Sequence, residues 1–136
     1  DGRVPPDDVT ADQLRNRSWW SGPDIVVMAD DYDLVEGNNG PLRQLVPYLP
    51  QARDLGLHVV VLRRSGGAGR AMYEPLVQAL KENGATGLLL DGDRQEGQLW
   101  PKTWLTRRPP GRGTLIRRSG SQELIQLALN TEEEDG

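Results

Sequence analysis

The chain of 136 residues contains no cysteine, which excludes disulfide bonds and thiolate metal sites. Its single histidine, His58, lies inside an apolar run, and the sequence offers it no histidine partner. This favours a strand residue over a metal ligand. No apolar stretch approaches the ~20 residues that a membrane-spanning helix needs, and no signal peptide opens the sequence. We therefore expect no direct insertion into a membrane.

A phosphate-binding motif is also missing. No G-x-x-x-x-G-K-[ST] pattern occurs, and the nearest glycine-rich stretch, residues 64–70 (RSGGAGR), lacks the Lys–Ser/Thr pair that contacts phosphate and Mg²⁺. The sequence begins at Asp1 rather than at a methionine. We expect either the C-terminal part of a longer ATPase domain or a vestigial site.

Apolar residues make up only 36% of the chain, whereas 16 glycines and 10 prolines indicate many loops. The length suits one domain. We predict a linker over residues 1–9, a domain over residues 10–130 and a disordered acidic tail over residues 131–136. The net charge of −4 argues against a surface built mainly to bind nucleic acid.

What the chain does contain is a buried-type strand that ends in acids. Residues 25–34 read IVVMADDYDL, an apolar run followed at once by Asp30 and Asp31. Ligands of open α/β sheets bind at the carboxyl ends of strands. In P-loop NTPases this is the Walker B position, where the first acid helps to hold Mg²⁺ and a second often orients the attacking water. The alternative is a strand followed by an Asx turn with solvated aspartates.

The remaining pattern predicts alternating strands and helices. Thr10 and Gln13 form a capping box for a short helix ending near Arg17. Pro47 and Pro50 should kink or divide the second helix. The other predictions are strands over 24–30, 57–62 and 86–90, helices over 41–55 and 70–83, a polar connection over 91–112, and a hairpin of strands over 114–117 and 123–127.

The β-α-β-α-β order predicts right-handed crossovers and a parallel sheet. The first two strands would end at one edge, so Asp30, Asp31 and Arg63 should share a crevice, with acids for a metal and a cation or polar sensor for a γ-phosphate. A salt bridge that only holds this edge together is the other interpretation.

Four stretches carry a family resemblance. Residues 19–34 (WWSGPDIVVMADDYDL) resemble the Walker B region of FtsK/SpoIIIE-type motors. With residues 41–58 (PLRQLVPYLPQARDLGLH), 63–68 (RRSGGA) and 92–97 (GDRQEG), they are similar to EccC or EccCb, the ATPase subunit of the type VII (ESX) secretion system of actinobacteria. The similarity is greatest to the last of its tandem ATPase domains and covers about residues 5 to 129.

The resemblance implies an α/β, RecA-like P-loop NTPase domain whose P-loop strand is absent from this chain. It further implies binding of ATP and Mg²⁺ once the missing half is present, and assembly with other ATPase domains into a hexamer. The expected location is the cytoplasmic face of the plasma membrane, within a membrane complex. The partners would be secreted WXG100 proteins, recognised by a C-terminal signal through residues that no motif identifies.

By this resemblance Asp30 would hold the metal through the nucleotide, Asp31 would be catalytic, and Arg63 and Arg64 would contact the nucleotide as sensors. The chain departs from the motors, which carry Asp-Glu and Thr-Gln-Arg where it has Asp30-Asp31 and Leu62-Arg63-Arg64. The aspartate side chain is one methylene shorter than glutamate, so it would hold the attacking water further from the γ-phosphate. A displacement of about 1 Å in the position of a reacting group can lower the rate on the order of a hundredfold. These departures favour nucleotide binding with weak or no hydrolysis.

Three hypotheses follow. The first is a substrate-recognising, nucleotide-responsive module of a secretion motor, and the second is part of an active ATPase whose N-terminal half lies elsewhere. The third is a DNA translocase, supported by a cluster of arginines. That cluster comprises Arg107, Arg108, Arg112, Arg117 and Arg118. A solvated strand face explains these arginines better, and no nucleic-acid partner is favoured.

Overall fold

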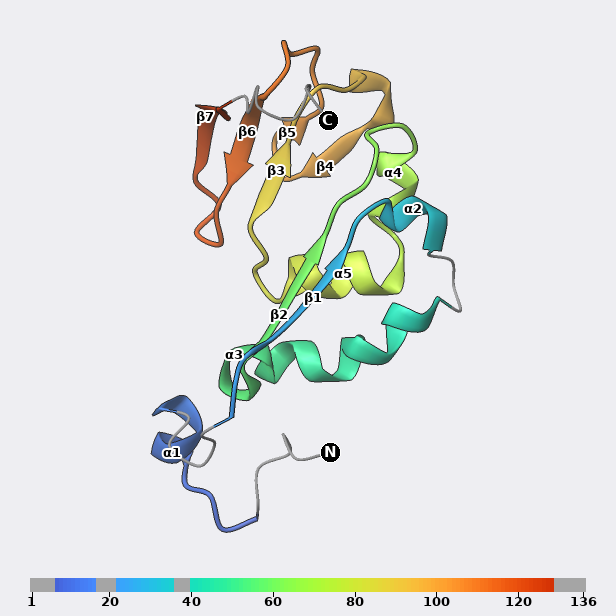
Figure 1. Ribbon diagram of the computed structural model, residues 1–136. Coiled ribbons are helices and arrows are strands. Elements are labelled where there is room, and N and C mark those ends of the chain that lie inside the picture. Colours follow the sequence, from blue (N-terminus) through green and yellow to red (C-terminus); the bar gives the residue numbers. More distant parts are fainter. Residues whose placement is uncertain (1–6, 17–21, 36–39, 129–136) are drawn as a thin grey trace, which may run out of the picture. The chain divides into compact units, whose positions relative to one another are not determined.

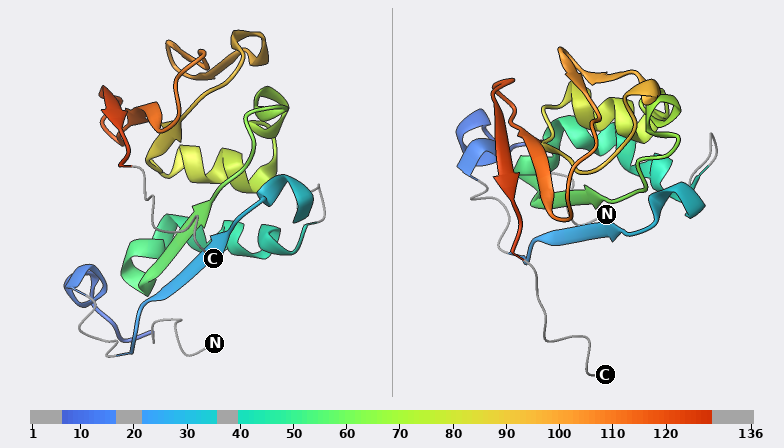
Figure 2. Two further views of the ribbon diagram at one scale, coloured as in Figure 1. Left: turned by 45° about the horizontal axis from the view of Figure 1, so that its top comes forward. Right: turned by 90° about the horizontal axis from the view of Figure 1, so that it is seen from above.

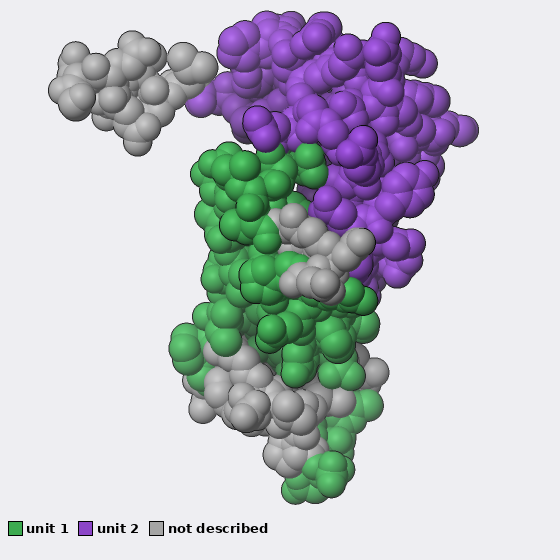
Figure 3. Space-filling model, turned by 90° about the vertical axis from the view of Figure 1, so that its right-hand side faces the viewer, with its two compact units in different colours: residues 1–63 green, residues 64–136 purple. Residues whose placement is uncertain are grey.

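The computed structural model describes residues 7–16, 22–35 and 40–128 (Figure 1). The chain divides into two compact units, Asp1–Arg63 and Arg64–Gly136, which are treated separately below (Figure 3). The predicted acidic tail and most of the predicted linker lie outside the described residues. Among the residues that are described, no helix is both long enough and apolar enough to cross a membrane.

The first unit pairs two parallel strands with short helices. Its elements are α1 (Ala11–Asn16), β1 (Ile25–Ala29), α2 (Tyr32–Val35), the 3₁₀ helix η1 (Pro41–Gln51), α3 (Ala52–Leu55) and β2 (Leu57–Val61). The capping box at α1 is confirmed: the Gln13 N–H donates to Thr10 Oγ1 at 3.2 Å, and the Thr10 N–H donates to Gln13 Oε1 at 2.9 Å.

Strands β1 and β2 are confirmed and run side by side in parallel (Figures 1 and 2). Their register matches Ile25 with Leu57 and Ala29 with Val61. One face of the pair stays open to solvent, with Val26 60% and Met28 66% exposed. Parallel strands are normally covered on both faces, so this exposed apolar face is unusual.

The chain between the strands is helical but not one α-helix. Pro47 and Pro50 lack the N–H groups that α-helical bonding needs, and the segment from Pro41 to Gln51 winds as a 3₁₀ helix. The prolines were expected to kink or divide an α-helix; instead both lie within one continuous 3₁₀ helix, and the division falls after Gln51. The following turn, α3, ends at Gly56, whose φ of 64° is left-handed and suits glycine as a cap.

The second unit contains two helices, a 3₁₀ turn and five strands in its described part. They are α4 (Ala68–Ala71), α5 (Pro75–Glu82), β3 (Gly87–Leu89), η2 (Arg94–Glu96), β4 (Gln98–Trp100), β5 (Thr103–Trp104), β6 (Arg112–Ile116) and β7 (Gln122–Gln126). The single helix predicted over 70–83 is wrong, because Pro75 begins a new helix and Glu74 before it is extended.

The predicted hairpin is confirmed as β6 and β7, although each strand begins earlier in the chain. Strand β3 lies antiparallel to β6, giving the order β3-β6-β7 (Figure 1). The expectation that all three leading strands share one parallel sheet is therefore wrong for β3. At Gly113 of β6 the absence of a side chain allows this pairing, since an added Cβ would lie 2.6 Å from the Leu89 carbonyl oxygen.

The connection over 91–112 is more ordered than its sequence indicates. It contains η2 and the antiparallel pair β4–β5. Leu99 and Leu105 from this region pack with Ala68 of α4 as a buried cluster, and Trp100 packs against it. This cluster places α4 next to β4 and η2.

Candidate functional site

Two aspartates follow β1 at the carboxyl end of the parallel pair. Asp30 Oδ1 accepts a hydrogen bond from the Asp31 N–H group at 2.9 Å. Asp31 has a φ of 49°, a left-handed conformation that aspartate adopts more readily than most residues. The chain turns tightly here, and both residues are exposed.

Strand β2 brings Arg63 to the same edge. The two strands remain paired up to their ends, because the Leu62 N–H donates to the Ala29 carbonyl oxygen at 2.9 Å. Arg63 therefore follows β2 at the level of the two aspartates, as the sequence predicts. Of the four predicted site residues, the first unit contains Asp30, Asp31 and Arg63. The fourth, Arg64, begins the second compact unit.

This edge has the chemistry that a nucleotide-bound magnesium ion requires. Mg²⁺ in nucleotide sites is held through one or two carboxylates together with phosphate oxygens and water. The hydrogen bond from the Asp31 N–H engages one oxygen of Asp30, and a carboxylate has about four acceptor sites, so the turn is compatible with a cation. Within the described residues no group of three or more His, Cys, Asp or Glu side chains is placed to hold a metal ion.

The second unit has a surface pocket between the glycine-rich loop after β2 and the turn η2. It is lined by Gly67, Gly69, Arg70, Asp93, Gln95 and Glu96. The two carboxylate oxygens of Glu96 accept hydrogen bonds from the loop, one from the Gly67 N–H at 2.8 Å and one from the Gly69 N–H at 3.0 Å. The glycine-rich loop, which lacks the residues of a phosphate-binding motif, thus binds a carboxylate of its own chain.

Sequence reasoning missed Glu96. The sequence offered two signals: both partner segments are rich in glycine, and Asp93 precedes Gln95 as a candidate cap. The structure shows this cap, in which Asp93 Oδ1 accepts a hydrogen bond from the Gln95 N–H at 2.8 Å. Neither signal pairs the two segments, which are separated by more than twenty residues. Tertiary contact alone identifies this glutamate.

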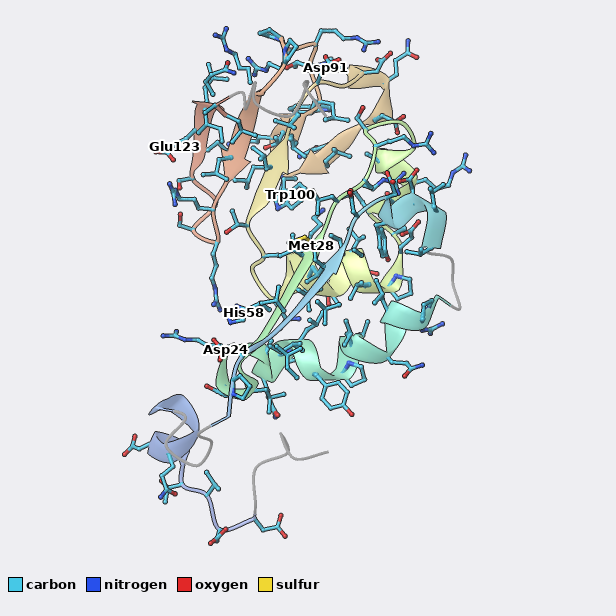
Figure 4. All side chains as sticks on the ribbon, in the orientation of Figure 1. Asp24, Met28, His58, Asp91, Trp100 and Glu123 are labelled. Atoms are coloured by element: carbon cyan, nitrogen blue, oxygen red, sulfur yellow. The ribbon has the colours of Figure 1, made fainter. Side chains whose placement is uncertain are left out.

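Two tryptophans of the second unit lie beneath cations. The Lys81 Nζ sits 4.9 Å from the Trp100 ring centre and donates to the Leu99 carbonyl oxygen, and the Arg94 guanidinium is 4.8 Å from the ring of Trp104. Burial lowers the pKa of Lys81 below its ordinary value. These rings therefore have partners inside the unit (Trp100 is labelled in Figure 4).

The arginine cluster contains internal ion pairs. Arg117 Nη2 lies 2.8 Å from Glu123 Oε2 across the β6–β7 hairpin, and Arg107 Nη1 lies 3.6 Å from Asp91 Oδ2. The two acids, Glu123 and Asp91, are labelled in Figure 4. In the first unit, His58 Nε2 is 3.2 Å from Asp24 Oδ2, at the rim of the exposed apolar face. His58 is therefore a strand residue, as its sequence context predicts.

No family model matches the chain. Among curated proteins, it is 53% identical over 127 residues to the ESX-4 secretion system protein EccC4 of Mycobacterium tuberculosis, covering 93% of the chain and 10% of that protein. It is 45% identical over 128 residues to the ESX secretion system protein EccC of Thermomonospora curvata, covering 94% of the chain and 10% of that protein. The chain thus spans about a tenth of the length of these relatives.

Solved structures give the same picture. The cytoplasmic domain of the T. curvata type VII secretion ATPase EccC matches with a TM-score of 0.89 and 44% identity, over 96% of this chain and 15% of that one. ATPases 2 and 3 of T. curvata EccC, in complex with a signal sequence peptide, match with a TM-score of 0.88 and 44% identity, over 96% and 24% of the two chains.

Proposed function

Because the chain belongs to the EccC-type ATPase domains of type VII (ESX) secretion systems, we propose that it is the nucleotide-responsive part of a secretion motor. It binds ATP with Mg²⁺ together with a P-loop half that this sequence does not contain. The observation that carries the proposal is the meeting of Asp30, Asp31 and Arg63 at one carboxyl edge of two parallel strands.

The proposed roles follow from charge and position. Asp30 ligates the magnesium of the nucleotide, Asp31 orients water at the γ-phosphate, and Arg63 and Arg64 respond to the phosphate charge. Asp31 is one methylene shorter than the glutamate usual in such motors, so it holds water less well and hydrolysis is weak or absent.

The secreted partner is proposed from the relatives. One of the similar structures contains a signal sequence peptide bound to EccC ATPases 2 and 3. We infer that this domain takes part in recognising the C-terminal signal of WXG100-type substrates. It would do so at the inner face of the plasma membrane, beside other ATPase domains of a hexameric complex.

Removal of the Asp30 carboxylate tests the nucleotide role. In the full-length polypeptide, Asp30→Ala should weaken binding of Mg–ATP by about tenfold or more, yet leave metal-free ATP within about twofold, because a metal ligand acts only through the ion. Titration calorimetry with and without EDTA measures both affinities.

The control is Asp7→Ala, which removes another exposed carboxylate, one that lies outside the sheet. Its affinity for Mg–ATP should equal that of the wild type. If Asp30→Ala binds Mg–ATP as tightly as this control does, Asp30 has no role at the metal.

A further inference from the structure

Glu96 holds the loop that follows β2 by both of its carboxylate oxygens. The Gly67 and Gly69 N–H groups, two residues apart, each donate to a different oxygen at 2.8 and 3.0 Å. Hydrogen bonds to an ionised acceptor are about twice as strong as neutral ones. A single side chain thus restrains two points of one loop.

Backbone contact reinforces this restraint. Gly67 has a φ of 82°, a left-handed conformation, and forms the cap of α4. A Cβ added to Gly69 would lie 2.0 Å from the Glu96 carbonyl oxygen, so only glycine allows the two backbones to approach this closely. The loop and the turn η2 therefore fit together through main chain as well as side chain.

The turn that presents Glu96 is itself well supported. Asp93 caps it through the Gln95 N–H at 2.8 Å, and Gly97 closes it with a φ of 89°. On the loop side, Ala68 is buried against Leu99 of the strand β4 that follows η2. The segments that carry the two partners of the glutamate bridge therefore meet in one buried cluster, through Ala68 next to the loop and Leu99 after the turn.

We propose that Glu96 is a positioning residue for Arg64, the phosphate-responsive arginine of the second unit, an inference that rests on the proposed nucleotide function. Arg64 precedes Gly67 by three residues, and three residues of extended chain span at most about 10 Å. Clamping Gly67 and Gly69 therefore restricts the position of Arg64. The clamp adds to the hydrogen bond from the Ala68 N–H to the Ser65 carbonyl oxygen at 3.0 Å, so the segment between Arg64 and Gly69 is restrained at several points.

The glutamate also occupies the backbone N–H groups that a phosphate could otherwise use. If its purpose were to block an anion site, its removal would strengthen binding of phosphate at the loop. A positioning role predicts that removal of Glu96 weakens binding, because a less restrained Arg64 binds the nucleotide phosphates less well. The sign of the change in affinity separates these two roles.

The experiment compares Glu96→Gln, Glu96→Asp and the control Gln98→Ala in the full-length polypeptide. Gln keeps the size but offers one acceptor oxygen, Asp keeps the charge but is too short to reach both amides, and Gln98 is exposed at the start of β4. Hydrogen exchange of the peptide containing Gly67 and Gly69 reports the clamp. Mg–ATP affinity and turnover report its consequence.

We expect exchange about tenfold faster in both Glu96 variants, as loss of a charge-assisted hydrogen bond implies, with unchanged exchange in β6 and β7. Mg–ATP affinity or turnover should fall about three- to tenfold, whereas Gln98→Ala should match the wild type. If Mg–ATP affinity or turnover falls in Glu96→Asp as well as in Glu96→Gln, the length of the side chain matters and not its charge alone.

Unchanged exchange at the loop would overturn the clamp. Faster exchange with wild-type nucleotide affinity and turnover would overturn the positioning role, and tighter phosphate binding would replace it with the blocking role. Failure of the proposed function is distinguishable, because Asp30→Ala would then leave the Mg–ATP affinity unchanged whatever the exchange data showed.

Discussion

At the scale of single residues, backbone geometry determines more of the contacts around the candidate site than side-chain chemistry does. Asp31 adopts a left-handed turn after β1, and Gly69 lies against the backbone of η2. Asp30 and Arg63 could be assigned to a common edge from sequence, because strand ends follow from the apolar pattern. The Gly69 contact could not, since nothing local to the loop specifies what touches it.

Gly69→Ala should destabilise the protein, because its Cβ would lie 2.0 Å from a carbonyl oxygen that belongs to the backbone. Overpacking of this kind typically costs about 1–3 kcal/mol in the free energy of unfolding. Urea denaturation followed by circular dichroism measures the loss.

Gly66→Ala is the matched control, three residues away in the same loop. An added Cβ at Gly66 meets nothing within 4 Å. Its stability should stay level or rise by about 0.4–1 kcal/mol, because alanine restricts the unfolded chain. Equal losses at Gly66 and Gly69 would contradict the close approach described here.

At the scale of elements, the strands that end in charge or turn residues were predicted well, whereas the break between two helices before Pro75 was not. The run of apolar residues defines β1 and β2 regardless of neighbours. Helix α4 ends at Ala71 and Pro75 begins the next helix, although the periodicity of apolar residues continues across that break. β3 looks like β1 and β2 in sequence, yet it pairs antiparallel with β6 because a hairpin offers it a partner.

Leu99→Ala tests whether the connection over 91–112 contributes to the core. Leu99 is 1% exposed and packs with Ala68 and Leu105. Truncation of a buried leucine typically costs about 2–5 kcal/mol. Leu124→Ala on β7, where the side chain is 61% exposed, should change the free energy of unfolding by less than about 0.5 kcal/mol.

Chemical denaturation of both leucine variants gives these values directly. A loss at Leu124 as large as that at Leu99 would mean that β7 is covered by another part of the polypeptide. A negligible loss at Leu99 would contradict the buried cluster.

At the scale of the whole molecule, the parallel pair is incomplete by itself. Within the described residues, β1 and β2 pair only with each other and leave Val26, Met28 and Val60 exposed. The relatives are about ten times longer than this chain. We expect either that the P-loop strand of the RecA-like sheet, which this sequence does not contain, comes from a companion segment, or that this part of the chain has rearranged.

The proposed recognition of substrate concerns the longer polypeptide and is tested there. The full-length polypeptide should retain a WXG100-type protein in a pull-down, and removal of the C-terminal tail of that protein should abolish retention. A scrambled tail of the same composition serves as the control. Equal retention of the tailless protein would count against recognition of a C-terminal signal.

The sequence by itself determined the two parallel-type strands, the acids and arginine at their ends, and the family of the domain. Each of these is written in contiguous residues, because apolar runs and short motifs act locally. Only the tertiary structure decided that β3 pairs with β6 and that Glu96 holds the loop after β2. Both depend on contacts between segments more than twenty residues apart, where the fit of one backbone against another selects the partner.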